Sequence, residues 1–250
     1  MCNLYANTTA AEAMRRLFKV TPDRDHLGNA EPRPAIFPKG AAPILRLDGD
    51  GARRLDVSHW GFLLPQVSKR TGQPIQPRAV NNARDDKLRT SAFWRSAFRA
   101  RRCLIPASSF CEAKGRSPAT HVWFGVTGEG ARPPFALAGI WQDHGGEEGE
   151  RLLVRSMITT RPNALVATVH PDRMPAILRP GDYQTWLAGD PDEAFALIEP
   201  YPAEEMVIHQ QGVGLKSDPG DDGPGEHGPE EHGPDDAAPD DGAPAQGALF

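Results

Sequence analysis

Cys2 offers the most distinctive chemistry in this sequence, because it directly follows the initiator methionine. Aminopeptidases remove Met1 when the second side chain is as small as that of cysteine, and the mature chain then begins with a 1,2-aminothiol. An α-amino group has a pKa of about 7.7–8.0 and a free thiol one of about 8.5, so both have nucleophilic fractions near neutrality. An aldehyde condenses with the amine to an imine, and the thiol then closes a thiazolidine ring. Taken alone, Cys2 also fits a small buried strand residue.

The 250 residues allow one large domain or two small ones, and 39% hydrophobic residues suffice for a sizeable core. No apolar run approaches the roughly 18 residues of a membrane span, and the N-terminus lacks a secretory signal, so we expect a cytoplasmic protein without a membrane partner. Three cysteines without paired spacing fit a reducing compartment better than a disulfide framework. A zinc site from Cys103, Cys111 and His121 matches no usual ligand spacing, and no metal is expected.

The net charge of −5 combines two oppositely charged parts. Residues 217–250 hold ten acidic side chains and no Lys or Arg, whereas residues 1–216 hold 28 basic and 23 acidic ones. The tail repeats proline at every fifth position from 219 to 244 and has almost nothing apolar to bury, so we expect it to be disordered. A mildly basic body is compatible with a nucleic-acid partner, and an ordinary surface with a solubilising tail fits the charge equally well.

Hydrophobic periodicity predicts one α+β domain over 1–216, with a mostly antiparallel or mixed, barrel-like β-sheet and flanking helices. A strand at 2–6 precedes an amphipathic helix that Thr9 and Glu12 open as a capping box and that ends near Lys19. Other runs predict strands at 43–47, 53–58, 102–106, 121–126, 135–141 and 152–160, and helices at 91–100 and 182–198. The proline-rich segments 20–40 and 65–80 are predicted to be long irregular loops, which are often functional.

A set of short motifs extends in order over the whole body. They are Met1-Cys2, Trp60-Gly61, Asn81-Asn82-Ala83-Arg84, Cys103-Leu-Ile-Pro106, Ser109-Phe-Cys-Glu112, Phe135-Ala-Leu-Ala-Gly-Ile-Trp141, Ile158-Thr-Thr160 and His170-Pro-Asp-Arg-Met-Pro-Ala-Ile-Leu178. Each motif is weak alone, but together they resemble the SOS response-associated peptidase (SRAP) family over roughly residues 1–210.

The resemblance implies a single α+β domain that binds single-stranded DNA and forms a covalent thiazolidine with the ring-opened sugar of an abasic site. Such a protein acts in the DNA damage response, as a DNA–protein crosslinking enzyme of hydrolase or lyase type, and we expect a monomer at the nucleoid without a cofactor. The family's nucleophile falls on Cys2, its active-site asparagine on Asn82, its acid/base glutamate on Glu112 and its histidine on His170.

Chemistry makes these assignments reasonable on independent grounds. A carboxyl group shielded by Phe110 has a raised pKa, so Glu112 can move protons between the amine and the departing water. Imidazole titrates near neutrality, so His170 can assist the opening of the sugar ring. The amide of Asn82 can hold the aldehyde-derived hydroxyl or the N-terminal amine. In isolation, Glu112 also fits an ordinary surface residue and Asn82 a turn residue.

Arginines close to these motifs are candidates for contacts with DNA phosphates. The first candidates are Arg84 and Arg173, followed by Arg33 and Arg161. Trp60 can stack on a base, although aromatic residues in β-rich runs more often belong to the core.

The chain departs from the family pattern at three places. Where the family commonly has Cys-Gly-Arg and an aromatic residue, this chain has Cys2-Asn3-Leu4-Tyr5, so an arginine contact is missing. After Trp60-Gly61 the usual tryptophan is absent, and any wedge between bases falls to Leu63 and Leu64. The spacing from His170 to Met174 is one residue longer than expected, which bears on the direction of Arg173.

Two other functions fit the same residues. Cys2, His170 and Asn82 can be drawn as an N-terminal cysteine peptidase that removes the residue before Cys2. An aldehyde target explains the amine as well as the thiol, so the peptidase ranks second. The third hypothesis is a single-stranded DNA-binding module without chemistry, in which Cys2 is a core residue.

The last five residues, Gln246-Gly247-Ala248-Leu249-Phe250, resemble the short peptide with which bacterial replication and repair proteins bind the DNA sliding clamp. In that motif a glutamine opens a unit that Leu-Phe closes, and the apolar pair enters a hydrophobic pocket. Gln246, Leu249 and Phe250 match, whereas Gly247 lacks the usual leucine-like contact. The tail is therefore predicted to bind the sliding clamp as a second partner. The alternative is a tail that ends in two apolar residues by chance and binds no clamp.

Overall fold

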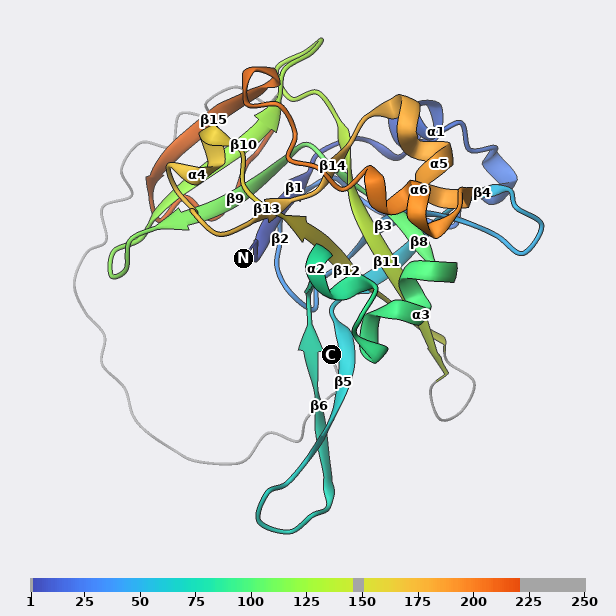
Figure 1. Ribbon diagram of the computed structural model, residues 1–250. Helices are drawn as coiled ribbons and strands as arrows, with labels where there is room; N and C mark the ends of the chain where they lie inside the picture. The colour runs from blue at the N-terminus through green and yellow to red at the C-terminus, as the bar shows by residue number, and fades with distance from the viewer. Residues whose placement is uncertain (1, 146–150, 221–250) are drawn as a thin grey trace, which may run out of the picture.

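Five strands close into a barrel at the centre of the body (Figure 1). They are β3 (Ala41–Leu47), β4 (Arg53–Trp60), β8 (Arg102–Ala107), β11 (Phe135–Gly145) and β12 (Arg151–Thr160). Neighbours are antiparallel except for the parallel pair β4–β12, and the pairing of β11 with β12 closes the ring. The structure is a computed structural model that describes residues 2–145 and 151–220. The predicted disordered tail beyond 220 and the peptide with Gln246, Leu249 and Phe250 lie outside the described residues.

A second sheet of five antiparallel strands packs against the barrel in the order β15-β10-β9-β1-β2. The strands are β1 (Leu4–Asn7), β2 (Arg33–Ile36), β9 (Ser109–Lys114), β10 (Thr120–Val126) and β15 (Met206–Val213). Only Ser108 separates β8 from β9, so the chain passes directly from the barrel into the second sheet. A core cluster that includes Trp60, Ile105, Phe110 and Phe124 joins the two sheets.

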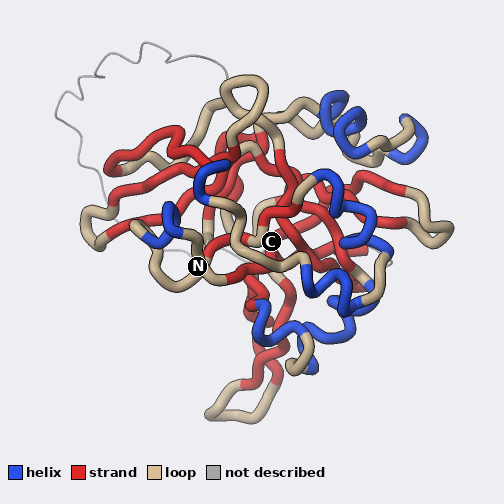
Figure 2. The backbone as a smooth tube through the Cα atoms, turned by 45° about the horizontal axis from the view of Figure 1, so that its top comes forward, coloured by secondary structure: helices blue, strands red, loops and turns tan. Residues whose placement is uncertain are grey.

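Helices cover one side of the barrel and enclose the larger core cluster (Figure 2). Met14 and Phe18 of α1 (Ala11–Phe18), Trp94 and Phe98 of α3 (Ala92–Ala100) and Trp186 of α5 (Tyr183–Ala188) are buried there. The remaining helices in the described part of the chain are α2 (Asp85–Leu88), α4 (Ala164–Ala167), α6 (Pro191–Ala196) and the 3₁₀ turns η1 (Pro22–Arg24), η3 (Pro180–Asp182) and η4 (Ala203–Glu205). Three short strands complete the barrel sheet: β7 (Asn82–Arg84) and β13 (Met174–Pro175) pair with β12, and β14 (Ile177–Leu178) pairs with β11. The predicted α+β fold class is confirmed.

Two helix predictions need correction. The capping box at the first helix is wrong, because Ala10 is the N-cap without a side-chain bond and Glu12 instead pairs with Arg16 at 2.6 Å. The segment 182–198 forms two short helices and not one. Gly189 ends α5, and Asp190 starts α6 with a capping box of its own.

The segment 65–80 is not an irregular loop. It belongs to a hairpin of β5 (Phe62–Val67) and β6 (Pro74–Val80) that projects from the body (Figures 1 and 2). Proline lacks the N–H that a strand interior needs, but this ribbon has only two strands, so each keeps a free edge. A bulge at Pro65 absorbs the irregularity. The periodicity also missed β2, β9 and β15, and β9 carries Glu112.

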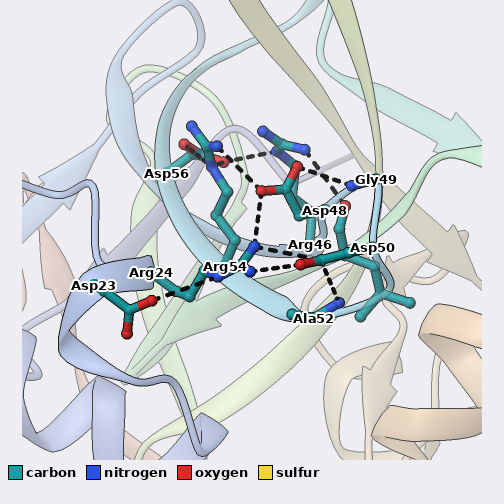
Figure 3. A network of polar contacts seen from close by, with 10 residues as sticks. Asp23, Arg24, Arg46, Asp48, Gly49, Asp50, Ala52, Arg54 and Asp56 are labelled. Atoms are coloured by element: carbon teal, nitrogen blue, oxygen red, sulfur yellow. Dashed lines mark hydrogen bonds and ion pairs between the residues drawn. The ribbon is translucent and has the colours of Figure 1, made fainter.

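Arginines and aspartates neutralise one another around the turn between β3 and β4 (Figure 3). Arg24 pairs with Asp50 at 2.5 Å, and Arg46 and Arg54 both contact Asp56. Arg24 thus holds η1 to this turn, and three of the 28 basic side chains of the body are already paired here.

The folded body continues past Ser217. Asp218 is fully buried, where Ser109 Oγ donates to it at 2.5 Å and Arg132 pairs with it at 3.1 Å. Among the described residues no helix is long and apolar enough to cross a membrane.

Candidate functional site

Cys2 lies just before β1, beside β9. The β1–β9 register pairs Leu4 with Cys111, and Cys2 Sγ lies 3.4 Å from the Leu4 carbonyl oxygen and 3.8 Å from that of Cys111. The residue is only 1% exposed, and this burial, with Glu112 nearby, raises the pKa of the Cys2 thiol well above its ordinary value. The expectation of an appreciable thiolate fraction near neutrality is therefore wrong for the folded chain. Cys2 holds a neutral thiol.

Asn82 holds the backbone of Cys2 directly. It opens β7, which pairs with β12 so that Asn82 lies opposite Met157. Its Nδ2 donates to the Cys2 carbonyl oxygen at 2.7 Å, while its Oδ1 is buried and has no hydrogen-bond partner among the described residues. Asn81 adds a contact from its Nδ2 to Asn3 Oδ1 at 2.8 Å. The two asparagines thus tie the N-terminal residues to the start of β7.

Glu112 lies on β9, immediately after Cys111. It is 4% exposed, and burial raises its pKa from 4.5 to about 7. The prediction of a shielded carboxyl group with a raised pKa is confirmed, and the alternative of an ordinary surface glutamate is excluded. A carboxyl group with this pKa exchanges its proton readily at neutral pH.

His170 follows α4 in the turn that leads to β13. The backbone N–H of Arg173 donates to His170 Nδ1 at 3.2 Å, so the neutral ring carries its proton on Nε2. Partial burial lowers the pKa of His170 below its ordinary value, which keeps the imidazole neutral at pH 7.

An open cleft of about 610 Å³ brings Glu112 and His170 together with Asn3 and Cys111. A second hollow is lined by Arg84, His170, Asp172 and Arg173. His170 lines both, so the two hollows adjoin at this residue. Glu112 and His170 line the cleft, and Cys2 lies beside Glu112 with its backbone held by Asn82. The four sequence-predicted residues therefore gather at one place, although the segment before β1, β7, β9 and the α4–β13 turn supply them.

The residues predicted to contact DNA differ in exposure and in ion pairing. Arg84 lies at the edge of the site with its side chain 52% exposed, paired with Asp86. The side chain of Arg173 is largely buried and pairs with Asp85 at 2.5 Å, so it holds the turn in place and is not free for phosphate.

The remaining predicted contacts lie away from the cleft or inside the core. Arg33 is exposed on β2, and Arg161 is exposed and paired with Glu199; neither lines the cleft. Trp60 as a stacking residue is a wrong prediction, because it is 0% exposed and its Nε1 donates to the Asn81 carbonyl oxygen at 2.7 Å. From the core, Trp60 thus holds the backbone of Asn81, next to Asn82. Leu63 and Leu64 are half-buried on β5.

Sequence reasoning missed three residues that line the cleft: Phe37, His121 and Lys216. His121 had been considered only as a zinc ligand. Phe37 follows β2 in a segment predicted to be a loop, and Lys216 was placed at the end of the body. No periodicity marks any of them, because their position depends on the second sheet and on the anchored segment around Asp218.

Comparisons with known proteins identify the family of this chain. The family described as SOS response associated peptidase (SRAP) matches residues 1–213. The abasic site processing protein YoqW of Bacillus subtilis is 33% identical over 171 residues, which cover 67% of this chain and 74% of YoqW, and YoaM of the same organism is 31% identical over 189 residues, covering 70% and 81%. A crystal structure from Bordetella bronchiseptica has a TM-score of 0.66 at 23% identity, with 85% of this chain and 99% of that chain covered. One from Bacteroides thetaiotaomicron has a TM-score of 0.64 at 22% identity, with 84% and 91% covered. This chain belongs to the SRAP family.

Proposed function

We propose that this protein processes abasic sites and captures the ring-opened sugar in single-stranded DNA as a thiazolidine on Cys2 after removal of Met1. The observation that carries the proposal is the joint placement of Cys2, Asn82 and Glu112. Asn82 fixes the carbonyl of Cys2 at 2.7 Å, and a carboxyl group with a pKa of about 7 lies buried nearby. Relatives that are 31–33% identical bear the name abasic site processing protein.

The first step joins the amine of Cys2 to the sugar aldehyde. The ionised Glu112 takes a proton from the ammonium group, and the neutral nitrogen attacks the aldehyde carbon. One proton of the attacking nitrogen moves to the oxygen and gives a hydroxyl group. Glu112 then returns its own proton to this hydroxyl, which leaves as water while a protonated C=N bond forms. The buried Oδ1 of Asn82 is a suitable acceptor for an N–H of this amine, because the other end of its amide is already bound to the Cys2 carbonyl.

The second step closes the ring. The sulfur of Cys2 bonds to the imine carbon, and its proton passes to the imine nitrogen, so the overall reaction releases one water. The raised pKa of the Cys2 thiol is compatible with this order, because the amine reacts first and the thiol loses its proton only as the C–S bond forms. In this proposal His170 assists the opening of the sugar ring, which its neutral ring with the proton on Nε2 supports.

The same thiol pKa counts against the N-terminal peptidase. A cysteine protease needs a thiolate or a paired base, whereas burial and the neighbouring Glu112 both oppose ionisation of Cys2. The burial of Glu112 likewise argues against a pure binding module, since a buried carboxyl group whose pKa is raised by desolvation costs stability that a function would explain.

The test is incubation of the purified protein with a single-stranded oligonucleotide that carries one abasic site, followed by a denaturing gel and intact-mass analysis. We expect a covalent complex with the abasic strand, none with the intact strand, and a protein mass without Met1. Retention of Met1 together with absence of the complex would remove the capture and the peptidase alike.

We also propose that the C-terminal peptide with Gln246, Leu249 and Phe250 binds the sliding clamp. The 27 residues between Asp218 and Gln246 would, as a flexible coil, place it roughly 30 Å from the body. Such a tether raises the local concentration of the capture site at replication forks. A synthetic peptide covering 240–250 should bind purified clamp, and the double change of Leu249→Ala and Phe250→Ala should abolish this. Equal binding of both peptides would leave the tail without this role.

A further inference from the structure

Phe37 exposes an aromatic ring in the cleft that holds Glu112 and His170. Phe37 is 47% exposed, whereas most aromatic side chains of the described residues are buried in the core. Its backbone is fixed by a tight turn, in which Gly40 N–H donates to the Phe37 carbonyl oxygen at 2.9 Å and Lys39 N–H donates to that of Trp60 at 2.7 Å. The ring is therefore presented from a defined position.

Lys216 lines the same cleft from the segment that follows β15. The carbonyl oxygens on either side of it are bound, Leu215 O by Trp123 Nε1 at 2.8 Å and Ser217 O by Gln210 Nε2 at 2.7 Å. Two residues later Asp218 is buried. Firm anchoring on both sides thus holds an exposed ammonium group beside the cleft.

The charges around the cleft leave Lys216 available. Arg84, Arg161 and Arg173 each pair with a carboxylate, whereas no ion pair of Lys216 occurs among the described residues. Glu112 is the one acidic residue among the described side chains that line this cleft. An anion that enters would therefore meet Lys216 without competition from a surface carboxylate.

We propose that Phe37 and Lys216 form a nucleotide subsite next to the capture site, which rests on the proposed function. Phe37 stacks on the base that flanks the abasic residue, and Lys216 binds a phosphate of the same strand. A flanking base lacks a stacking neighbour where the base is missing, so one of its faces is free for an aromatic ring. Stacking tolerates any base, and a cation binds the phosphate without regard to sequence.

The two hollows share His170, so together they extend the surface that a strand can contact. Arg84 and His170 line one hollow, and His170, Phe37 and Lys216 line the cleft. A strand whose abasic residue sits at Glu112 and His170 can thus be held on both sides. Arg84 contacts one flank, and the subsite holds the other.

The probe is a labelled single-stranded oligonucleotide with a tetrahydrofuran residue, which resembles an abasic site but has no aldehyde. Its affinity for the full chain is measured by fluorescence anisotropy over a range of salt concentrations. Phe37→Ala should weaken binding about tenfold, as expected for loss of one stacking ring. Phe37→Trp keeps an aromatic face and should bind within about twofold of the wild type.

Lys216→Ala should reduce the slope of log affinity against log salt by roughly 0.7, the value for one phosphate on a single strand. Matched controls are Val213→Ala, which shortens another exposed apolar side chain, and Lys114→Ala, which removes a lysine outside the cleft. Both should leave affinity and slope unchanged. Unaltered binding by Phe37→Ala, or an unaltered slope for Lys216→Ala, overturns the subsite.

A parallel capture assay with a true abasic strand separates the two proposals. Capture by the wild type together with unchanged tetrahydrofuran binding by both variants means that the subsite is wrong and the proposed function stands. Absence of capture by the wild type, with weakened tetrahydrofuran binding by both variants, means that the proposed function is wrong and the subsite stands. A wild-type protein that binds neither strand overturns both.

Discussion

Replacing Glu112 by glutamine should produce two opposite effects, slower capture and a more stable protein. Glutamine has nearly the shape of the protonated glutamic acid but cannot accept the proton of the ammonium group. Loss of a general acid–base group typically slows a reaction by 10²–10⁴-fold, so we expect the capture rate of Glu112→Gln at pH 7.5 to fall by about 100-fold or more. The non-covalent affinity for the tetrahydrofuran strand should remain, because Glu112 contributes no attraction for phosphate.

The pH dependence of this effect follows from the pKa of about 7 for Glu112. The ratio of the wild-type rate to the Glu112→Gln rate cancels the titration of the amine, which both proteins share. About half of Glu112 is ionised at pH 7 and about one tenth at pH 6, so this ratio should fall about fivefold between these values. A carboxyl group with the ordinary pKa of 4.5 would leave the ratio flat over the same range.

The stability gain has the same origin. The folded-state pKa lies above the unfolded value of 4.5, so ionisation of Glu112 opposes folding; the penalty is absent below about pH 4.5 and reaches its full size above about pH 7. It amounts to about 3 kcal/mol at pH 8 and about 1 kcal/mol at pH 5.5. Glu112→Gln should raise the free energy of unfolding by these amounts, measured by urea denaturation at the two pH values.

The control is Glu204→Gln, which removes an exposed carboxyl group and should change neither the capture rate nor the stability. A Glu112→Gln protein that is both slower and less stable would indicate structural damage. A rate ratio that is flat between pH 6 and 8 would refute the assignment of Glu112 as the proton carrier.

Three further predictions concern neighbouring groups. His170→Ala should alter strand cleavage at the abasic site or reversal of the adduct, while capture itself continues; gel analysis over time would show this, and unchanged kinetics would remove His170 from the mechanism. Arg84→Ala should weaken single-strand binding and lower the salt slope by roughly 0.7, whereas Arg173→Ala should chiefly lower the melting temperature because its partner Asp85 loses its ion pair. Asp218→Asn breaks the ion pair of a fully buried carboxylate and should cost about 3 kcal/mol in urea denaturation, against less than about 0.5 kcal/mol for Asp192→Asn in an exposed pair; similar values for the two would refute the anchoring of this segment.

The sequence was sufficient to predict the fold class and the central strands, because alternating or β-rich runs mark β4, β8, β11 and β12 directly. It was not sufficient for the hairpin β5–β6. Prolines normally indicate loops, and only the isolation of a two-stranded ribbon, a tertiary feature, makes them tolerable in strands. The split of 182–198 at Gly189 and Asp190 was readable in principle, since glycine and a capping aspartate adjoin there.

In the site, too, some features were predictable from the sequence and others depend on tertiary packing. The raised pKa of Glu112 was predicted from the family resemblance together with its apolar neighbour Phe110, whereas Glu112 in isolation fitted a surface residue equally well. The thiol of Cys2 was misjudged, since its burial comes from β9 and Asn82, which lie about 80 or more residues away in the chain. Trp60 and Phe37 show the limit most clearly. Both are aromatic residues near strands, and only the packing of the second sheet decides that Trp60 is buried and Phe37 is exposed.

The most direct test of the capture mechanism is to locate the DNA remnant on the protein. Wild type and Cys2→Ala are incubated with the abasic strand, the DNA is digested, and the N-terminal peptide is sequenced by mass spectrometry. The account predicts a chain that begins at Cys2 and carries the sugar remnant on that residue, with none on the Cys2→Ala protein. A remnant on a lysine, or equal crosslinking by Cys2→Ala, would contradict it.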